Sequence, residues 1–352
     1  MNLKALSNKV NGHIDIIHRS AVIKAHRNRY KKFNDVLNKD QRGEIKQFYS
    51  GTAHFKFGAQ GFYTSKTGTY SKEYIPDELW YGYILPFYNN QKAAIYMDNK
   101  CFYPRMFPGI KQPETILIRE NGLLRDSDYH YYTKDEARDI LSKEDSLFVK
   151  QAIMSYGGHG VTFFEGNDVC NKVLEVVQAN DCDYVIQKPI RQHSEMAKLN
   201  QSSVNTVRVC SLLSEGGGVK VYSVITRMGI NGSKVDNASS GGITCGVHTD
   251  GQLKGIAFDK YGNKYESHPD TGLSFDSIKI PSFEKVCELA ISCHYMIPHF
   301  RLVSWDIAID KQGDPILIEA NLSRGELDFH QLNNGPIFGG DTSIILDEVF
   351  KR

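Results

Sequence analysis

Residues 304–325, with the sequence SWDIAIDKQGDPILIEANLSRG, constrain the fold more strongly than any other stretch of the chain. Two segments in it, 304–310 and 315–322, are rich in apolar residues that alternate with polar ones, as in β-strands with one buried face. The dipeptide Gln312-Gly313 lies between them, and glycine at such a position favours a tight turn. The stretch therefore predicts a β-hairpin close to the C-terminus.

The predicted hairpin brings together oxygen-bearing side chains. If Gln312-Gly313 is a two-residue loop, Asp306 lies opposite Glu319, and Asn321 points to the same side of the sheet as Glu319. Directly opposed like charges destabilise a sheet unless a cation lies between them. Oxygen ligands favour Mg²⁺ or Mn²⁺, and a Mg²⁺ ion held by one or two carboxylates usually also binds substrate phosphates. The alternative is an exposed hairpin whose acids point into water.

Composition sets few further limits. The chain has 352 residues, enough for two domains or for one domain with a lid, and its formal net charge of +1 does not call for nucleic acid. Its seven cysteines are scattered, and none are paired as CxxC, which favours reduced thiols in the cytoplasm over a disulfide framework or a zinc site. The N-terminus lacks the apolar core of a signal peptide, and no apolar run approaches the ~18 residues of a membrane span.

The N-terminal quarter of the chain indicates structure more than chemistry. Residues 14–48 are predicted to be helical, and within them residues 18–32 carry six Lys or Arg side chains and no acid. Such a basic helix can lie on a membrane surface or an acidic partner, although a solvated face is the commoner explanation. Residues 50–90 are aromatic and turn-rich, which predicts an accessory layer on the main fold.

From about residue 92 short strands and helices alternate. Thr133 and Glu136 form a predicted capping box at the start of a helix over 134–143. Helices are also expected over 171–180, 282–297 and 345–352. Strands are expected over 93–98, 114–121, 129–133, 147–151, 161–165, 183–190, 204–213 and 219–229.

A glycine-rich loop connects the predicted strands 147–151 and 161–165. Its glycines, Gly157, Gly158 and Gly160, allow backbone N–H groups to approach an anion, and Lys150 on the preceding strand adds a positive charge. The loop is neither a Walker motif nor a dinucleotide fingerprint, because no Gly-Lys-Ser/Thr follows and it leads into a strand. It predicts either a phosphate-binding loop or an ordinary hairpin.

Three further positions carry candidate binding groups. Gln187, Lys188 and Ile190 end a strand where the chain is expected to leave a small lid, and groups at such a hinge can pair with an adenine edge, although an ordinary strand end fits equally. Arg208 and Arg227 lie on two neighbouring apolar strands, where an arginine must meet an anion or form a structural ion pair.

The order of these features resembles the ATP-grasp fold. The segments QKPIRQH, SVNTVRV, SSGGITCGV and WDIAIDKQGDPILIEAN resemble more narrowly the sugar-transfer-associated ATP-grasp proteins, which accompany polysaccharide biosynthesis genes. The resemblance covers roughly residues 95–335 and implies an α+β fold with a small lid and a larger mixed-sheet domain. The expected parts are an N-terminal extension (1–94), the start of the core (95–133), the lid (134–188) and a C-terminal subdomain with the metal site (189–352).

The resemblance also implies roles for the candidate residues. The lid residues Lys150, Gly157, Gly158 and Gly160 would hold ATP phosphates, and Gln187, Lys188 and Ile190 would hold adenine. The hairpin residues Asp306, Glu319 and Asn321 would hold Mg²⁺, or Mn²⁺. Arg208, Arg227 and Arg324 are the candidates for stabilising the transferred phosphoryl group or a substrate anion.

One departure from the family pattern concerns position 304. D-alanine–D-alanine ligase has an arginine two residues before the metal aspartate, whereas this chain has Ser304, so the catalytic cation must come from elsewhere. The second phosphate-binding lysine of the family has three candidates here, Lys100, Lys111 and Arg105.

The resulting expectation is an ATP- and Mg²⁺-dependent ligase that joins a carboxylate to an amine, hydroxyl or thiol through an acylphosphate. The expected setting is polysaccharide or cell-surface glycan biosynthesis in the cytoplasm, with an amino acid as the nucleophile. The basic helix 18–32 is a candidate contact for a membrane surface or an acidic partner. The alternatives are a phosphotransferase on the same fold and a non-catalytic nucleotide-binding scaffold.

Overall fold

The computed structural model describes residues 19–153, 160–179, 181–233, 236 and 241–351. Contacts within the chain define two compact units. The first unit combines Met1–Asn90 with Glu326–Arg352, and the second is the continuous stretch Gln91–Gly325.

The described part of the first unit is helical. Residues 19–29 form a helix, and a second helix begins after Asn38, which forms a capping box with Gln41. The predicted continuous helix over 14–48 is therefore wrong between residues 30 and 38, and residues 14–18 lie outside the described part. The helix that begins after Asn38 is α2 (Lys39–Phe48). The other helical segments are η1 (Lys31–Phe33), α3 (Gly58–Thr67), α4 (Asp77–Leu79), the π-helical turn η2 (Trp80–Ile84), α5 (Leu85–Tyr88), α12 (Leu327–Asn334), η7 (Gly339–Asp341) and α13 (Thr342–Phe350).

Some basic side chains of residues 18–32 pair with acids inside this unit. Arg27 contacts Glu78 at 2.7 Å, and Arg29 contacts Asp328 at 2.5 Å. The neighbouring acid of α4, Asp77, is buried. These pairs give part of the basic stretch a structural role.

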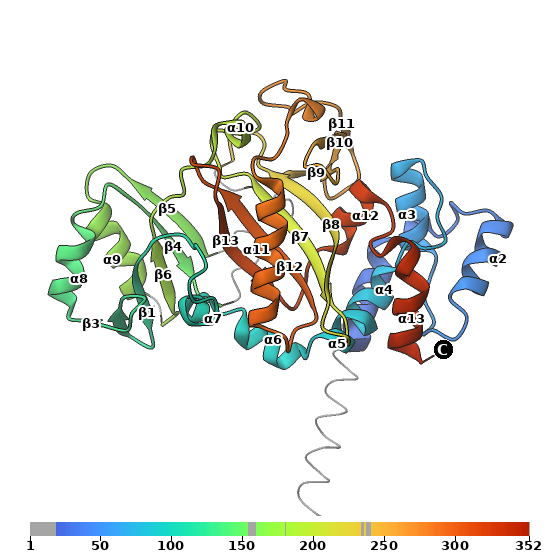
Figure 1. Cartoon of the computed structure of the whole chain (residues 1–352), viewed down its shortest axis with the longest axis horizontal. Helices are drawn as coiled ribbons and strands as arrows, with labels where there is room; N and C mark the ends of the chain where they lie inside the picture. Colours follow the sequence, from blue (N-terminus) through green and yellow to red (C-terminus); the bar gives the residue numbers. More distant parts are fainter. Residues whose placement is uncertain (1–18, 154–159, 180, 234–235, 237–240, 352) are drawn as a thin grey trace, which may run out of the picture. The chain divides into compact units, whose positions relative to one another are not determined.

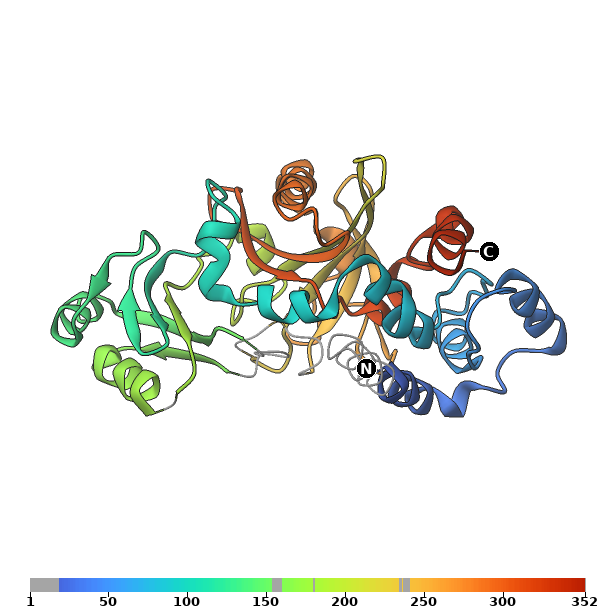
Figure 2. The same cartoon turned by 90° about the horizontal axis from the view of Figure 1, so that it is seen from below.

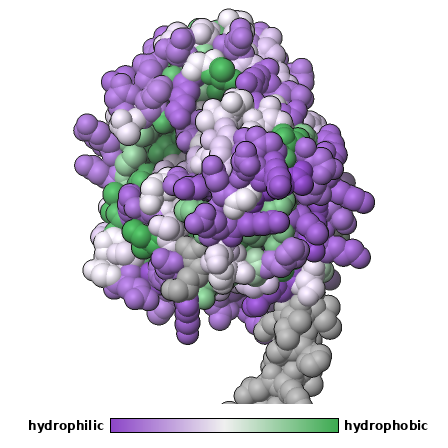
Figure 3. Space-filling model, turned by 90° about the vertical axis from the view of Figure 1, so that its right-hand side faces the viewer, coloured by the Kyte–Doolittle hydropathy of each residue, from purple (hydrophilic) through white to green (hydrophobic). Residues whose placement is uncertain are grey.

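Hydrophilic side chains cover most of the face that is visible in Figure 3, and apolar ones form smaller areas on it.

The first half of the second unit forms a six-stranded antiparallel sheet in the order β3-β2-β1-β6-β4-β5 (Figure 1). Apolar residues of two helices pack on the sheet, including Leu141 of the first helix and Val173 of the second. The predicted capping box of Thr133 and Glu136 is confirmed. The elements are β1 (Thr115–Glu120), β2 (Leu123–Arg125), β3 (Tyr131–Tyr132), α8 (Lys134–Leu141), β4 (Ser146–Gln151), β5 (Val161–Glu165), α9 (Val169–Ala179) and β6 (Tyr184–Gln187).

The strand predicted over residues 93–98 is wrong, because Gln91–Met97 is the helix α6. An apolar run of five residues does not distinguish a strand from a buried helix by periodicity, and its two alanines favour the helix. The short helices η3 (Lys100–Phe102) and α7 (Tyr103–Met106) follow it.

The second half of this unit forms a seven-stranded antiparallel sheet in the order β11-β10-β9-β8-β7-β12-β13. The β13 strand is therefore an edge strand. The predicted helix over 282–297 is confirmed as α11, and Figure 2 shows it lying along one face of this sheet. The elements are α10 (Ser194–Ala197), β7 (Thr206–Leu213), β8 (Val219–Met228), β9 (Ile243–Val247), β10 (Leu253–Phe258), β11 (Lys264–Tyr265), η6 (Phe275–Ser277), α11 (Phe283–Met296), β12 (Leu302–Ile309) and β13 (Pro315–Asn321).

The two faces of the seven-stranded sheet differ in polarity. Trp305 and Ile307 belong to the hydrophobic core that also contains Ala290 of α11. Because side chains alternate along a strand, Ser304 and Asp306 lie on the opposite face of β12. The helix and its core thus leave one face of the sheet for polar side chains.

Within the described ranges no helix is both long and apolar enough to cross a membrane. All seven cysteines are free thiols, and Cys101, Cys210, Cys245 and Cys293 are buried.

Candidate functional site

The pairing of Asp306 with Glu319 is confirmed, although the loop that was assumed for it is wrong. Asp306 lies opposite Glu319 across the β12–β13 ladder, whereas Ile309 lies opposite Pro315. The turn is thus one residue longer than the assumed Gln312-Gly313 loop, and the amide of Gly313 donates to Asp310 O at 2.9 Å. A register shift between Asp306 and Ile307 restores the expected pairing. Such β-bulges often occur beside active sites, where they redirect a side chain.

Asp306 is buried, with 3% exposure, and is held by two arginines. Arg208 of β7 donates to both carboxylate oxygens at 2.7 Å, and Arg227 of β8 donates to one of them at 2.7 Å. Arg208 lies directly opposite Asp306 in the sheet. Burial opposes ionisation of this carboxyl, but the charges and hydrogen bonds of both arginines hold its pKa well below the usual range.

The two other predicted metal ligands lie on β13. Glu319 accepts a hydrogen bond from Lys100 Nζ at 2.8 Å, and both side chains are partly buried. The amide nitrogen of Asn321 donates to Ser304 O at 3.1 Å and to Asp306 Oδ2 at 3.4 Å. These bonds use the nitrogen, so the amide oxygen is the atom of Asn321 that can ligate a cation.

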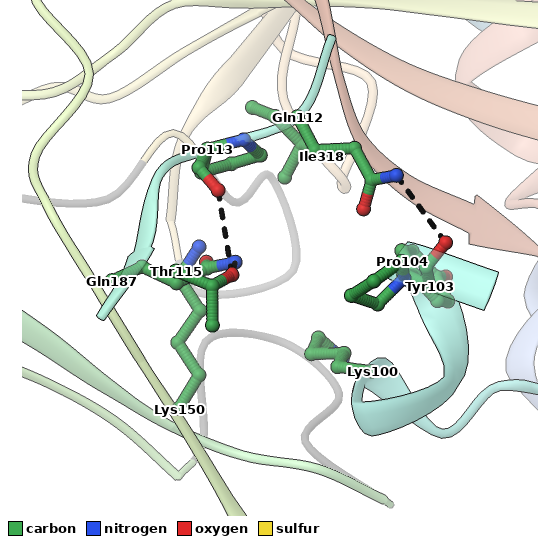
Figure 4. Close-up of a pocket in the computed structure, with 9 residues that line it drawn as sticks. All are labelled: Lys100, Tyr103, Pro104, Gln112, Pro113, Thr115, Lys150, Gln187 and Ile318. Carbon is green, nitrogen blue, oxygen red and sulfur yellow. Dashed lines mark hydrogen bonds between the residues drawn. The ribbon is translucent and has the colours of Figure 1, made fainter. Parts of the chain in front are cut away.

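A cavity beside Glu319 contains two lysines from different parts of the unit. Figure 4 shows Lys100, from the segment before β1, and Lys150, from β4, lining the same space. Burial and the neighbouring charge of Lys100 lower the pKa of Lys150 to about 8. The cavity is lined by Lys100, Tyr103, Pro104, Gln112, Pro113, Thr115, Lys150, Gln187 and Ile318, so both sheets contribute to it.

Lys100 is the only one of the three candidates for a second phosphate-binding cation that lines this cavity. Lys111 instead contacts Asp310 at 2.5 Å and Asp314 at 3.3 Å, beside the β12–β13 turn. The guanidinium of Arg105 stacks on the ring of Tyr129 at 3.8 Å. Sequence reasoning could not select Lys100, because the contact with Glu319 joins residues that lie 219 positions apart.

The predicted adenine-binding residues occupy different surroundings. Gln187 lines the cavity, and its side chain donates to the hydroxyl of Thr115 at 3.1 Å. The side chain of Lys188 pairs with Glu114 at 2.9 Å and Glu144 at 3.2 Å, and its backbone amide donates to Glu114 O. Ile190 is half-buried and does not line the cavity.

The remaining predicted residues lie at the ends of these elements. Gly157 and Gly158 lie outside the described residues. Gly160 has a φ of 73° and accepts a hydrogen bond from Gln151 N at 2.7 Å, which places it directly after the loop and beside the end of β4. Arg324 is exposed.

Ser304 occupies the position at which this sequence departs from the pattern of D-alanine–D-alanine ligase, and it packs closely against Gly325. Gly325 has a φ of 87°, and a Cβ atom there would lie 2.9 Å from Ser304 Oγ. The cations beside Asp306 come from Arg208 and Arg227 on the neighbouring strands. Two neighbouring strands therefore supply the positive charge that meets Asp306.

Two carboxyls that the sequence did not indicate also lie at the site. Asp236 accepts a hydrogen bond from Thr206 Oγ1 and lies 4.0 Å from Arg227 Nη2. Asp98 is buried with 7% exposure and accepts a hydrogen bond from Ser323 Oγ at 2.9 Å. Burial raises the pKa of Asp98 to about 7. Neither acid belongs to a recognisable motif, so only the fold brings them here.

The donor set fits a hard cation, since Asp306, Glu319 and Asn321 offer oxygen atoms alone. Both carboxylates are already paired with cationic side chains, Asp306 with two arginines and Glu319 with Lys100. Among the described residues no group of three His, Cys, Asp or Glu side chains has a metal-binding arrangement, and this trio contains only two such residues.

The two antiparallel sheets belong to an ATP-grasp fold. The family model described as sugar-transfer associated ATP-grasp matches residues 82–343, about three quarters of the chain. The chain belongs to this family, and both the resemblance and the α+β fold class predicted from the sequence are confirmed. ATP-grasp proteins are generally ligases that use ATP and Mg²⁺.

Comparison with solved structures finds several ATP-grasp enzymes. The ADP complex of PurK, an N5-carboxyaminoimidazole ribonucleotide synthetase, is 12% identical, with 63% of this chain and 44% of that chain covered and a TM-score of 0.39. The ATP-grasp ligase PsnB in complex with a minimal precursor is 14% identical (74% and 64% covered, TM-score 0.42). The VanG D-Ala:D-Ser ligase from Enterococcus faecalis is 13% identical (74% and 62% covered, TM-score 0.40).

The chain therefore spans less than two thirds of the length of each of these enzymes. A comparison with curated proteins found no match.

Proposed function

We propose that the protein is an ATP- and Mg²⁺-dependent ligase that activates a carboxylate as an acylphosphate and joins it to an amine, hydroxyl or thiol. The observation that carries this proposal is the arrangement of Asp306, Glu319 and Asn321 on one sheet face, with Lys100 and Lys150 beside them in one cavity. The proposed setting is the cytoplasmic synthesis of a polysaccharide or another cell-surface glycan, with an amino acid as the nucleophile.

The two lysines are the proposed phosphate-binding groups. Lys100 and Lys150 come from separate elements and approach the same cavity, so a triphosphate there would meet positive charge from two sides. Lys150 has a pKa of about 8 because of burial and the charge of Lys100. An anion between the two lysines relieves their repulsion and favours the charged form of both. Gly157, Gly158 and Gly160 are proposed to add backbone donors.

Asp306, Glu319 and Asn321 would hold Mg²⁺. When bound, this ion neutralises charge that develops on the transferred phosphoryl group. When Asp306 binds the metal, Arg208 and Arg227 would lose their partner. They can then bind phosphate oxygens on the same face of the sheet. Guanidinium groups suit this exchange, since they bind carboxylates and phosphates with the same geometry.

The proposed reaction has two steps. A carboxylate oxygen of the substrate attacks the γ-phosphorus of ATP, the bond to the β–γ bridging oxygen breaks, and ADP leaves. The nucleophile then attacks the carbonyl carbon of the acylphosphate, inorganic phosphate leaves, and the nucleophile loses its proton. Arg208, Arg227 and Arg324 are the proposed groups for the transferred phosphoryl group and the substrate anion. Catalysis then rests on positioning and charge neutralisation.

The adenine ring is proposed to bind beside Gln187, which lines the cavity at the end of β6. Lys188 and Ile190 follow it on the chain and are proposed to contribute a backbone carbonyl and an apolar contact. The backbone amide of Lys188 already donates to Glu114, so its carbonyl is the group that we expect to pair with adenine.

The proposal is tested by ADP release in the presence of MgATP, a panel of sugar acids and a panel of amino acids, with mass spectrometry of the products. A new amide or ester together with ADP and phosphate is the expected result. A stable phosphorylated acceptor would instead identify a phosphotransferase on the same fold. Nucleotide binding without turnover of any acceptor would favour a non-catalytic scaffold.

Replacing Lys100 with methionine is expected to weaken MgADP binding roughly 10- to 100-fold. This range corresponds to the loss of one hydrogen bond to a charged group, about 1.5–3 kcal/mol. Calorimetric titration measures the change. The matched control is Lys111→Met, because this lysine pairs with acids at the β12–β13 turn and does not line the cavity. Equal effects of the two substitutions would contradict the assignment of Lys100.

A further inference from the structure

The strand that carries Glu319 and Asn321 lies at the edge of its sheet. An edge strand has one row of N–H and C=O groups without a neighbouring strand, and its position is held less firmly than that of a central strand. A metal site requires the opposite, because Mg²⁺ demands nearly ideal octahedral geometry. The groups that hold the outer side of β13 therefore decide how well its ligands are placed.

The backbone of Lys111 accepts one hydrogen bond from Leu317 N of β13, at 2.9 Å, and around the predicted metal ligands side chains from one short segment, Asp98–Tyr103, contact this strand and the residues after it. The hydroxyl of Tyr103 accepts a hydrogen bond from Ala320 N at 2.9 Å and lies 3.4 Å from Ala320 O. The carboxylate of Asp98 accepts from Leu322 N at 3.3 Å and from Ser323 Oγ at 2.9 Å.

These contacts surround both predicted metal ligands of β13. Ala320 lies between Glu319 and Asn321, and Leu322 directly follows Asn321. Lys100 of the same segment pairs with Glu319 itself at 2.8 Å. The segment thus contacts four of the five residues from 319 to 323.

The Asp98–Tyr103 segment is itself firmly anchored. Asp98 and Tyr103 are buried, with 7% and 5% exposure. Lys100 N donates to Ala152 O at 3.0 Å, directly after β4, and the side chain of Asn99 accepts from Cys101 N at 2.9 Å. The segment is thus held both at the end of β4 and at β13.

We infer that Asp98 and Tyr103 are positioning residues that fix the outer side of β13 and thereby set the placement of Glu319 and Asn321 for the metal. This inference rests on the proposed function, since it concerns the metal of the same site. Asp98 does not line the cavity, whereas Tyr103 lines it and contacts Ala320 through its hydroxyl. Small errors of placement at such sites are costly, and lost supporting contacts typically weaken metal binding 10- to 100-fold.

The test uses the full chain with Asp98→Asn, Tyr103→Phe and Ser323→Ala. Ser323→Ala removes a hydrogen bond of Asp98 from a partly exposed position and is the mildest of the three. The controls are Asp259→Asn and Tyr132→Phe. Asp259 is a buried acid that accepts backbone hydrogen bonds in the turn after β10. Tyr132 belongs to the six-stranded sheet, and its hydroxyl donates to Asp126 at 2.9 Å.

Two quantities are measured for each protein. The first is the Mg²⁺ concentration that gives half-maximal enhancement of ADP binding, and the second is the ADP affinity in EDTA. We expect the Asp98 variant to need about tenfold more Mg²⁺ or more, with an unchanged ADP affinity in EDTA and normal controls. Tyr103 lines the proposed nucleotide cavity, so for Tyr103→Phe we expect a larger loss of Mg²⁺-dependent than of metal-free ADP binding. The Ser323 variant is expected to shift in the same direction by less.

An unchanged Mg²⁺ requirement in all three variants would overturn the inference. Equal losses of metal-dependent and metal-free binding would also overturn it, because they indicate general damage to the fold. Failure of the proposed function gives a different result, since the wild-type protein itself would then show no Mg²⁺-dependent nucleotide binding.

Discussion

Replacing Arg208 with methionine is expected to lower the melting temperature of the protein by about 6–12 °C near neutral pH. Arg208 makes two hydrogen bonds of 2.7 Å with Asp306, which is only 3% exposed. Breaking a buried ion pair from one side costs about 3–5 kcal/mol. We take about 3 kcal/mol because Arg227 remains, and each kcal/mol lowers the melting temperature of a domain of 150–250 residues by about 2–4 °C.

The effect of Arg208→Met should depend on pH. The arginines hold the pKa of Asp306 in the folded protein below its ordinary value of about 4. A depressed folded-state pKa contributes stability that is complete above the unfolded-state pKa and is lost as the pH falls through the folded-state pKa. The difference between wild type and variant is therefore expected to be constant from pH 5 to 8 and to shrink below pH 4.

Melting curves between pH 3 and 8 measure this difference. Arg208→Lys keeps the charge but loses the bidentate geometry, so we expect an intermediate value. Arg191→Met is the control, because Arg191 is an exposed arginine of the same unit. A loss in Arg208→Met as small as that in Arg191→Met would contradict a stabilising pair at Asp306.

Replacing Glu319 with glutamine is expected to remove most of the enhancement of ADP binding by Mg²⁺. Glu319 is the more accessible of the two carboxylates in the predicted metal trio, with a side-chain exposure of 25%. Loss of a charged ligand should cost at least the roughly 10- to 100-fold that loss of a supporting group costs. Binding of ADP in EDTA should change much less, because the cavity lysines remain.

For Glu319→Gln, calorimetric titration of ADP with and without Mg²⁺ distinguishes the metal-dependent from the metal-free affinity. Glu288→Gln on α11 is the matched control, because this exposed acid lies on the helix that covers the apolar face of the same sheet. When an acceptor is known, turnover can be measured as well, and Glu319→Gln should show none. Full Mg²⁺ enhancement in Glu319→Gln would remove the metal assignment.

The central pairing of the site could be predicted from sequence, but for a partly wrong reason. Alternation and glycine located the hairpin and placed Asp306 opposite Glu319, although the assumed loop was one residue too short. The bulge beside Asp306 compensates for the longer turn. Bulges depend on local packing, and no residue between 306 and 319 indicates one.

Contacts between distant segments could not be predicted. Lys100, Asp98 and Tyr103 reach β13 from more than 200 residues earlier in the chain, and no spacing rule connects them. The segment 93–98 was also predicted as a strand, which hid the position of Asp98 directly after the helix α6. Helices with a strong signal, such as 134–143 with its capping box, were predicted correctly because their signal is local.

The arginines illustrate a third limit. Sequence reasoning recognised that Arg208 and Arg227 must meet an anion or form an ion pair, and both meet the same carboxylate, Asp306. The choice between a structural and a catalytic role depends on whether this pair exchanges when a phosphate arrives. Sequence alone contains no information about that exchange.

The most direct test of a magnesium–nucleotide site is the melting temperature of the wild-type protein with MgADP and with ADP in EDTA. Binding to the folded state adds about 2.7 kcal/mol at a ligand concentration 100 times the dissociation constant. We predict a saturable increase in the melting temperature that is larger with Mg²⁺ than with EDTA. No increase at millimolar MgADP would contradict a magnesium–nucleotide site in this protein.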